Sequence, residues 1–145
     1  MSESQFFIDQ AKKDLLSFCV FTDYNFDIIA HHELIADTLK QLMEWKIQNL
    51  IISMPPRAWK SRIMQEFIAF LLWHQPNTDI LYTWHTKSIL EDFSYNIRWR
   101  MRSKEYERIF NTRIAADSSA VSSWKVDNWG NFSIYWVGWG ITGKW

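Results

Sequence analysis

The stretch NLIISMPPRAWKSRIMQEFIAFLL, residues 49–72, places an apolar run, a short loop and an apolar helical pattern in direct succession. Residues 49–54 are mostly apolar and end at two prolines, which predicts a buried strand. Residues 61–72 have apolar side chains on most faces of a helix. The loop ends in a Lys-Ser pair, the residue types that reach the terminal phosphates and Mg²⁺ in phosphate-binding loops. We therefore predict a nucleotide-binding loop made of Pro56, Arg57, Ala58, Trp59, Lys60 and Ser61.

Two positions depart from the motif of such a loop, and the first is near Met54, where the glycine that begins the consensus is missing. Trp59 precedes Lys60, where the motif has glycine. Glycine lets the backbone adopt positive φ and approach the phosphates closely, whereas an indole would fill the space that they need. An ordinary strand-to-helix turn with a solvated Lys60 remains open as the alternative.

Regular patterns continue on both sides of the loop. Helical spacing predicts helices at residues 4–18, 31–44, 87–101 and 105–110, and residues 79–84 read as a second strand. Residues 122–137 alternate and are interrupted at 128–131, which predicts a hairpin. This order favours an α/β fold with P-loop NTPase-like layers: a partial parallel sheet, flanking helices and the hairpin. We expect a helical lead-in at residues 1–48 and an incomplete ATPase core at residues 49–145.

Composition indicates the cellular compartment of the protein but not its activity. The 145 residues carry 16 basic and 16 acidic side chains, so net charge gives no sign of a nucleic-acid or membrane partner. A single cysteine, Cys19, suits a reducing compartment and is expected to be a buried thiol. The longest apolar run, Phe67–Trp73, is too short to span a bilayer, and the first residues lack a secretory core. These features predict an intracellular protein without a membrane span.

Several short motifs occur in a fixed order around the loop. They are His31–His32, then Met54–Arg57 with Lys60 and Ser61, then EDF at Glu91–Phe93, SKEYERIF at Ser103–Phe110, AADS at Ala115–Ser118 and GITGK at Gly140–Lys144. In order and spacing, the set resembles the N-terminal ATPase region of the large terminase subunit of tailed phages, the motor that packages DNA into capsids. The resemblance spans nearly the whole chain.

The resemblance implies ATP and Mg²⁺ as cofactors. Lys60 would hold the phosphates, Ser61 would bind magnesium through its hydroxyl, and Arg57 would reach the γ-phosphate as a catalytic arginine finger. Residues 83–86 resemble a helicase-like motif that couples the nucleotide to DNA. Implied partners are double-stranded viral DNA, the portal, the small terminase subunit and other copies in a homo-oligomeric ring, in the cytoplasm of a phage or prophage host. No DNA-binding residue is assigned.

The acids that this chemistry needs are expected shortly after the GITG loop in that family. The sequence has no apolar run that ends in paired acids, since Ile114–Ser118 is too short and has polar neighbours, and it has no nuclease domain. We therefore expect a truncated piece that binds nucleotide if glycine is restored in the loop and that hydrolyses it poorly. Two alternatives stay open: another helicase-like ATP-driven DNA translocase, and a non-enzymatic prophage remnant or binding module with an inactive loop.

The chain has 10 tryptophans and only 4 glycines, against the roughly 10 glycines of an average chain of this length. Our hypothesis is that UGA codons meaning glycine, as in some bacterial lineages, have been read as tryptophan. Conversion at seven positions would raise the glycines from 4 to 11. Trp124 matches a tryptophan of the family, and Trp84 and Trp99 are undecided. The seven positions fall on loop, turn or helix-ending sites: Trp45, Trp59, Trp73, Trp129, Trp136, Trp139 and Trp145. The alternative is true tryptophans in a degenerate homologue, which would bind negligible ATP.

The remaining polar clusters have simpler interpretations. Arg98–Lys104 concentrates basic groups at a helix end, where a solvated end that favours the helix dipole is preferred over a DNA contact. His31 and His32 have no accompanying ligands at metal spacing, so we predict packing at a helix start. His74 and His85 are assigned no role.

Overall fold

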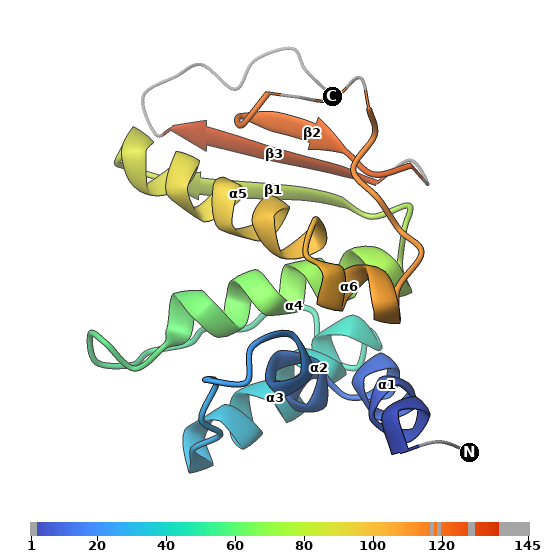
Figure 1. Cartoon of the computed structure of the whole chain (residues 1–145). Helices are drawn as coiled ribbons and strands as arrows, with labels where there is room; N and C mark the ends of the chain where they lie inside the picture. The colour runs from blue at the N-terminus through green and yellow to red at the C-terminus, as the bar shows by residue number, and fades with distance from the viewer. Residues whose placement is uncertain (1–2, 117, 119, 128–129, 137–145) are drawn as a thin grey trace.

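The computed structural model describes residues 3–116, 118, 120–127 and 130–136, in which six helices and one three-stranded mixed sheet form an α/β fold. Figure 1 shows the layers: the sheet lies over α5, α4 runs below α5, and α1, α2 and α3 cover the far side of α4. The elements in chain order are α1 (Glu3–Lys13), α2 (Leu15–Thr22), α3 (Ala30–Met43), α4 (Lys60–His74), β1 (Asp79–Trp84), α5 (Lys87–Met101), α6 (Lys104–Ile109), β2 (Ser123–Lys125) and β3 (Asn131–Trp136).

The sheet has the order β1-β3-β2, with β3 parallel to β1 and antiparallel to β2. The parallel register pairs Asp79 with Asn131 and continues to Trp84 with Trp136. Gly130 leads into β3 so close to the segment before β1 that an added Cβ would lie 2.5 Å from the carbonyl oxygen of Pro76. The predicted strand at residues 79–84 and the predicted hairpin are confirmed.

The predicted strand at residues 49–54 is wrong. No described strand pairs with this segment, although Leu50, Ile52 and Met54 are half-buried against the core while the residues between them are exposed. The alternation of burial is that of a strand, but no ladder of hydrogen bonds joins this segment to a described strand, and the parallel pair that the structure does show is β1 with β3. The parallel pair of the fold therefore involves a different segment from the one that the sequence indicates.

The predicted helix over residues 4–18 is two helices. Asp14 has extended backbone angles (φ −131°, ψ 128°), and its carboxylate accepts a 2.7 Å hydrogen bond from the backbone N–H of Ser17. Such an N-cap satisfies a donor that the first turn of α2 would otherwise leave unpaired. The apolar spacing continues across this break, so spacing could not reveal it.

Helices α3, α4, α5 and α6 confirm the predicted helices, with α5 matched to the residue. Helix α3 ends as expected at Trp45, which has φ 59°. The N–H of Trp45 bonds to the carbonyl of Leu42 and the N–H of Lys46 to that of Gln41, the two bonds of a Schellman motif. The predicted helix stop at Trp73 is wrong: α4 runs on to His74, and the indole of Trp73 stacks on Phe110 at 4.4 Å between ring centroids.

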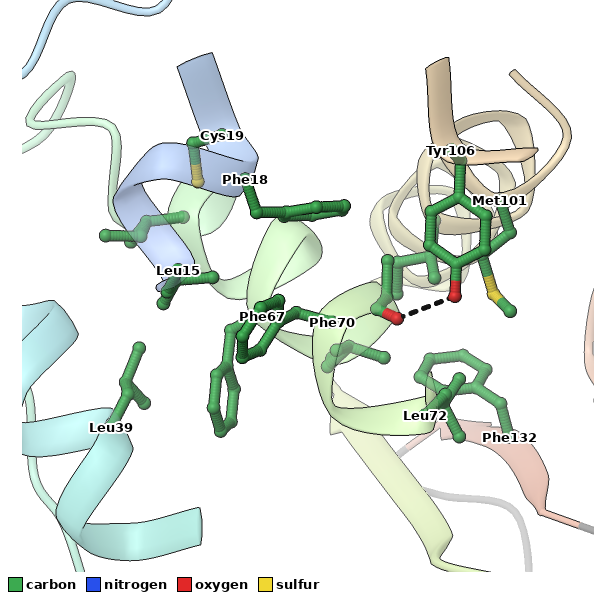
Figure 2. Close-up of a cluster of buried hydrophobic side chains, with 14 of the residues drawn as sticks. Leu15, Phe18, Cys19, Leu39, Phe67, Phe70, Leu72, Met101, Tyr106 and Phe132 are labelled. Carbon is green, nitrogen blue, oxygen red and sulfur yellow. Dashed lines mark hydrogen bonds between the residues drawn. The ribbon is translucent and has the colours of Figure 1, made fainter. Parts of the chain in front are cut away.

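Aromatic and aliphatic side chains from all layers share one core (Figure 2). Phe18 of α2 contacts Phe70, Tyr106 and Phe110 within 6.1 Å between centroids. The Tyr106 hydroxyl donates a 2.9 Å hydrogen bond to the carbonyl of Ala69, and burial raises its pKa well above the usual range. Cys19 is buried as predicted, and burial raises the pKa of its thiol. In the described parts of the chain no helix is long and apolar enough to cross a membrane.

Candidate phosphate-binding loop

The loop predicted from the sequence leads directly into the first turn of α4. Trp59 occupies the N-cap position with φ 59° and ψ 13°, and no side chain caps this helix end. The first backbone N–H groups of α4 are therefore not covered by a capping side chain, and Lys60 and Ser61 are exposed beside them. A helix N-terminus of this kind favours an anion because its N–H groups and dipole carry partial positive charge.

The backbone of the loop adopts conformations that glycine favours. Arg57 (φ 66°) and Trp59 (φ 59°) both have positive φ, with Ala58 between them. Left-handed angles at non-glycine residues are uncommon, and they cost of order 1–3 kcal/mol each. Alternation of this kind turns successive N–H groups toward one side, which is the geometry of an anion-binding nest. Trp59 thus stands at a position whose backbone suits glycine.

The segment between α2 and α3 holds the loop from one side. His31 Nε2 lies 3.3 Å from the carbonyl oxygen of Ala58, so a tautomer with hydrogen on Nε2 donates to the loop. The Phe26 ring meets the Trp59 indole edge-on at 6.4 Å between centroids. His32 is buried in the first turn of α3, as predicted, and stacks near Phe26. Among the described residues, no group of three or more histidine, cysteine or acidic side chains lies close enough together to hold a metal ion.

Burial changes the protonation of His32, although a contact with the backbone of Asp27 partly opposes its effect. Neither ring nitrogen has a hydrogen-bond partner of good geometry among the described residues. Burial and the neighbouring His31 lower the pKa of His32, because the charged imidazolium loses hydration and faces a second basic ring.

On its other side the loop borders a groove of about 610 Å³. Lys60 and Ser61 line this groove together with Asp92 and Asn96 of α5 and Trp84 at the end of β1. Asp92 lies within the EDF motif, but no local pattern marks it as a site residue, because only the packing of α5 beside α4 brings it to the same groove as Ser61. Arg57 is exposed, and its predicted catalytic role stays a prediction.

Only part of the basic group at the end of α5 is solvated as the sequence indicates, because Arg102 and Lys104 are exposed but two other arginines are not. Arg98 and Arg100 are buried, with 7% and 4% of their surface exposed. Arg100 donates to Glu66 Oε1 from Nε at 2.9 Å, with Nη2 of the same side chain 2.8 Å away, and it also donates to the carbonyl of Thr22. The sequence signal that could have indicated this pair is Glu66, an acid on the apolar side of a helix.

The same network reaches the first turn of α4. Arg62 Nη2 bonds to Asp23 Oδ2 at 2.6 Å, and its Nε lies 3.2 Å from Glu66 Oε1. Burial raises the pKa of Glu66 above its ordinary value, while the charge of Arg100 opposes the rise and keeps a counter-ion at hydrogen-bond distance. The network consists of Asp23, Arg62, Glu66 and Arg100, and it joins α2, α4 and α5 beneath the loop.

The tryptophans fall into distinct structural classes. Trp45 and Trp59 have positive φ, whereas Trp73 is helical and Trp99 lies within α5. Trp124 is 1% exposed, and its Nε1 donates a 2.9 Å hydrogen bond to Ser94 Oγ, as a true tryptophan would. Trp136 has strand backbone in β3. Trp129, Trp139 and Trp145 lie outside the described residues.

Comparisons with protein-family models, with curated proteins and with solved structures found no match. The assignment of function therefore depends on the geometry of the loop and on the order of the motifs.

Proposed function

We propose that residues 56–61 bind the phosphates of ATP with Mg²⁺, and that the chain is part of a DNA-packaging terminase motor. The observation that carries the nucleotide proposal is the positive φ of Trp59, immediately before Lys60 and Ser61 at the start of α4. A phosphate-binding loop requires a left-handed or closely approached residue, an ammonium, a hydroxyl and an open helix N-terminus in this order. The segment supports the proposal in all four respects once the indole is replaced by a bare backbone.

Within this proposal the named residues have separate roles. The ammonium of Lys60 neutralises the terminal phosphates, the hydroxyl of Ser61 binds the Mg²⁺ ion, and Arg57 stabilises charge on the γ-phosphate. His31 and the uncapped N–H groups of α4 orient the loop. The partners of the motor, namely viral DNA, portal, small terminase subunit and further copies in a ring, and its place in the host cytoplasm, are proposed from the motif order.

The proposal includes glycine at position 59 of the native protein. The positive φ of Trp45 and Trp59 supports recoding of UGA at these two sites, because glycine meets neither steric cost. The helical Trp73, stacked on Phe110, gives recoding no such support. Mass spectrometry of the protein from its native source is the direct measurement, and a tryptophan residue mass at position 59 would refute recoding there.

The binding proposal is tested by titrating Mg-ATP into the Trp59→Gly variant. We expect this variant to bind at least tenfold more tightly than the tryptophan protein, because the space for the phosphates is freed. The double variant Trp59→Gly/Lys60→Ala should lose at least tenfold of that affinity, since a charge-assisted bond is removed. Trp45→Gly is the matched control: it relieves the same backbone strain on the other side of α3 and should leave ATP binding unchanged.

A folded Trp59→Gly protein that does not bind Mg-ATP would contradict the proposal and favour a non-enzymatic remnant. Retention of the fold is checked by near-ultraviolet circular dichroism, to which the buried Trp124 and Tyr106 contribute. Hydrolysis is expected to stay low in every variant, because no described acid has been assigned to orient the attacking water.

A further inference from the structure

Residues 23–31, between α2 and α3, contact the chain on both sides of the residues that begin α4. On one side His31 Nε2 lies 3.3 Å from the carbonyl oxygen of Ala58. On the other side the carboxylate of Asp23 accepts a 2.6 Å hydrogen bond from Nη2 of Arg62, in the first turn of α4. We call residues 23–31 the supporting segment. The lysine and serine proposed to hold phosphate and magnesium lie between its two contacts, so the supporting segment limits how this part of the loop can move.

Between these two polar contacts the supporting segment packs into the protein. Phe26 is 4% exposed and meets the Trp59 indole edge-on. Asp23 also shapes the segment itself, because its Oδ1 accepts a 3.1 Å hydrogen bond from the backbone N–H of Asn25. The two oxygens of one carboxylate therefore have separate contacts, one that forms the turn at the start of the segment and one that binds Arg62.

The backbone of the loop requires such support. Arg57 and Trp59 have positive φ, and residues other than glycine keep such angles only where the surrounding structure holds them there. Glycine at position 59 would remove the steric cost, but it would also give the loop more backbone freedom. A loop with glycine there depends still more on its contacts at Ala58 and Arg62 to keep its N–H groups on one side.

The ion pair between Asp23 and Arg62 is better placed to position the loop than to stabilise the core. These side chains are 24% and 31% exposed, whereas those of Glu66 and Arg100 are 3% and 4% exposed. Partly exposed ion pairs contribute little to global stability, while breaking a buried pair costs much more. Replacement of Asp23 should therefore change the loop more than it changes the stability of the fold.

We propose that Asp23 and Arg62 are positioning residues for phosphate binding, whose ion pair holds the start of α4 against the supporting segment and keeps the loop N–H groups turned toward the phosphates. This inference rests on the nucleotide function proposed for residues 56–61. The pair acts through the backbone of the first turn of α4, where the N–H groups have no capping side chain. The part of the ligand that depends on the pair is therefore the triphosphate, whatever base it carries.

The test compares Mg-ATP with Mg-tripolyphosphate in titrations of the Trp59→Gly protein. Asp23→Asn in that background removes the charge but keeps an oxygen for the N–H of Asn25. We expect both ligands to bind about tenfold more weakly, because a charge-assisted hydrogen bond is lost. Backbone order parameters from NMR relaxation should fall at residues 57–61 and stay unchanged at residues 63–72, since only the loop loses its support.

Further variants separate positioning from a general loss of stability. Asp23→Glu keeps the carboxylate and should recover most of the lost affinity. Arg62→Gln should weaken binding, and adding Asp23→Asn to it should weaken binding no further, because both changes remove the same pair. Glu44→Gln is the matched control: it breaks an ion pair with Lys46 that is also 2.6 Å long, at the C-terminal end of α3, and it should change the affinity less than twofold.

The outcomes distinguish this proposal from nucleotide binding itself. If the Trp59→Gly protein binds both ligands and Asp23→Asn leaves both affinities unchanged, the positioning role is wrong and the nucleotide function stands. A loss for Mg-ATP alone would show that the supporting segment acts on the base or ribose, and it would overturn the positioning of phosphates. Lower order parameters throughout α4 would assign the pair to the stability of the helix instead. No binding of either ligand by the folded Trp59→Gly protein would overturn both proposals.

Discussion

The two ends of α4 differ in burial and in backbone strain. From Ile63 to Leu72 the helix is surrounded by the core, with Glu66 held by Arg100 and Ala69 bonded to Tyr106. At its N-terminus the helix emerges uncapped from a loop with two positive φ angles and exposed Lys60 and Ser61. The difference shows that the core fixes most of α4, whereas the backbone strain of this region is confined to the loop at its N-terminus.

Among the changes considered, removal of Arg100 should lower the stability of the buried part of α4 most strongly. Arg100→Met leaves the Glu66 carboxylate buried without its main counter-ion, and we expect the free energy of unfolding to fall by about 3–5 kcal/mol. The matched control is Arg102→Met, at an exposed position one residue after α5, with an expected change within about 0.5 kcal/mol. Urea unfolding at pH 7 measures both, and equal losses would show that the network does not stabilise the buried end.

Acidification should weaken the core that supports the loop. Burial lowers the pKa of His32 and His74 below their ordinary value of 6.5, so the unfolded chain binds protons first as the pH falls. Stability is fully present above pH 6.5 and is lost as the pH falls toward the folded-state pKa values, by up to about 1.4 kcal/mol per pH unit for each histidine. Urea unfolding between pH 7 and pH 5 should show this slope, and it should be absent in the double variant His32→Gln/His74→Gln. A slope that persists there would assign the effect to other groups.

Replacement of Trp45 measures the cost of positive φ at a tryptophan outside the candidate phosphate-binding loop. Trp45→Gly relieves positive φ at a 77% exposed residue, and we expect thermal unfolding to show stabilisation by about 1 kcal/mol. Trp99→Gly, at a 57% exposed position within α5, should instead destabilise by about 1 kcal/mol, since glycine is unfavourable inside a helix. Changes of the same sign at both positions would contradict the strain argument.

The smallest expected effect concerns the contact between His31 and the loop. His31→Ala removes one hydrogen bond to the carbonyl of Ala58, with a net contribution of about 0.5–1.5 kcal/mol. We expect faster amide exchange at residues 57–61 with a much smaller change in global unfolding, because the contact stabilises only the loop. Uniformly faster exchange through α3 would indicate that His31 supports the helix instead.

Local signals in the sequence predicted much of the secondary structure. Asp79–Trp84 and Lys87–Met101 match β1 and α5 to the residue, because hydrophobic periodicity and the residues at the ends already specify them. The break at Asp14 also has a local cause, a capping carboxylate, but the apolar spacing that continues across it concealed the break. Positive φ at Trp45 and Trp59 agrees with the expectation that these positions suit glycine.

The candidate site was predicted only in part. The Lys60–Ser61 pair and its place at the start of a helix could be predicted, because the motif consists of residues that are adjacent in the sequence. Asp92 and the contact of His31 with Ala58 could not be predicted, because they join residues far apart in the chain. The exposure of Arg98 and Arg100 was predicted wrongly because a charge on a helix end can be buried when another helix supplies its partner.

The amino-acid sequence by itself determined the bounds of β1 and α5, the presence of α3, α4 and α6, and the positive φ of Trp45 and Trp59, where the backbone suits glycine. These properties depend on hydrogen bonds and steric limits within a few residues. Only the tertiary structure decided that β3 pairs with β1, that residues 49–54 stay without a strand partner, that Trp73 continues a helix, and that Arg100 meets Glu66. Those outcomes depend on contacts between segments that are far apart in the sequence. Packing and charge pairing in the buried core determine them, and no single segment contains the information.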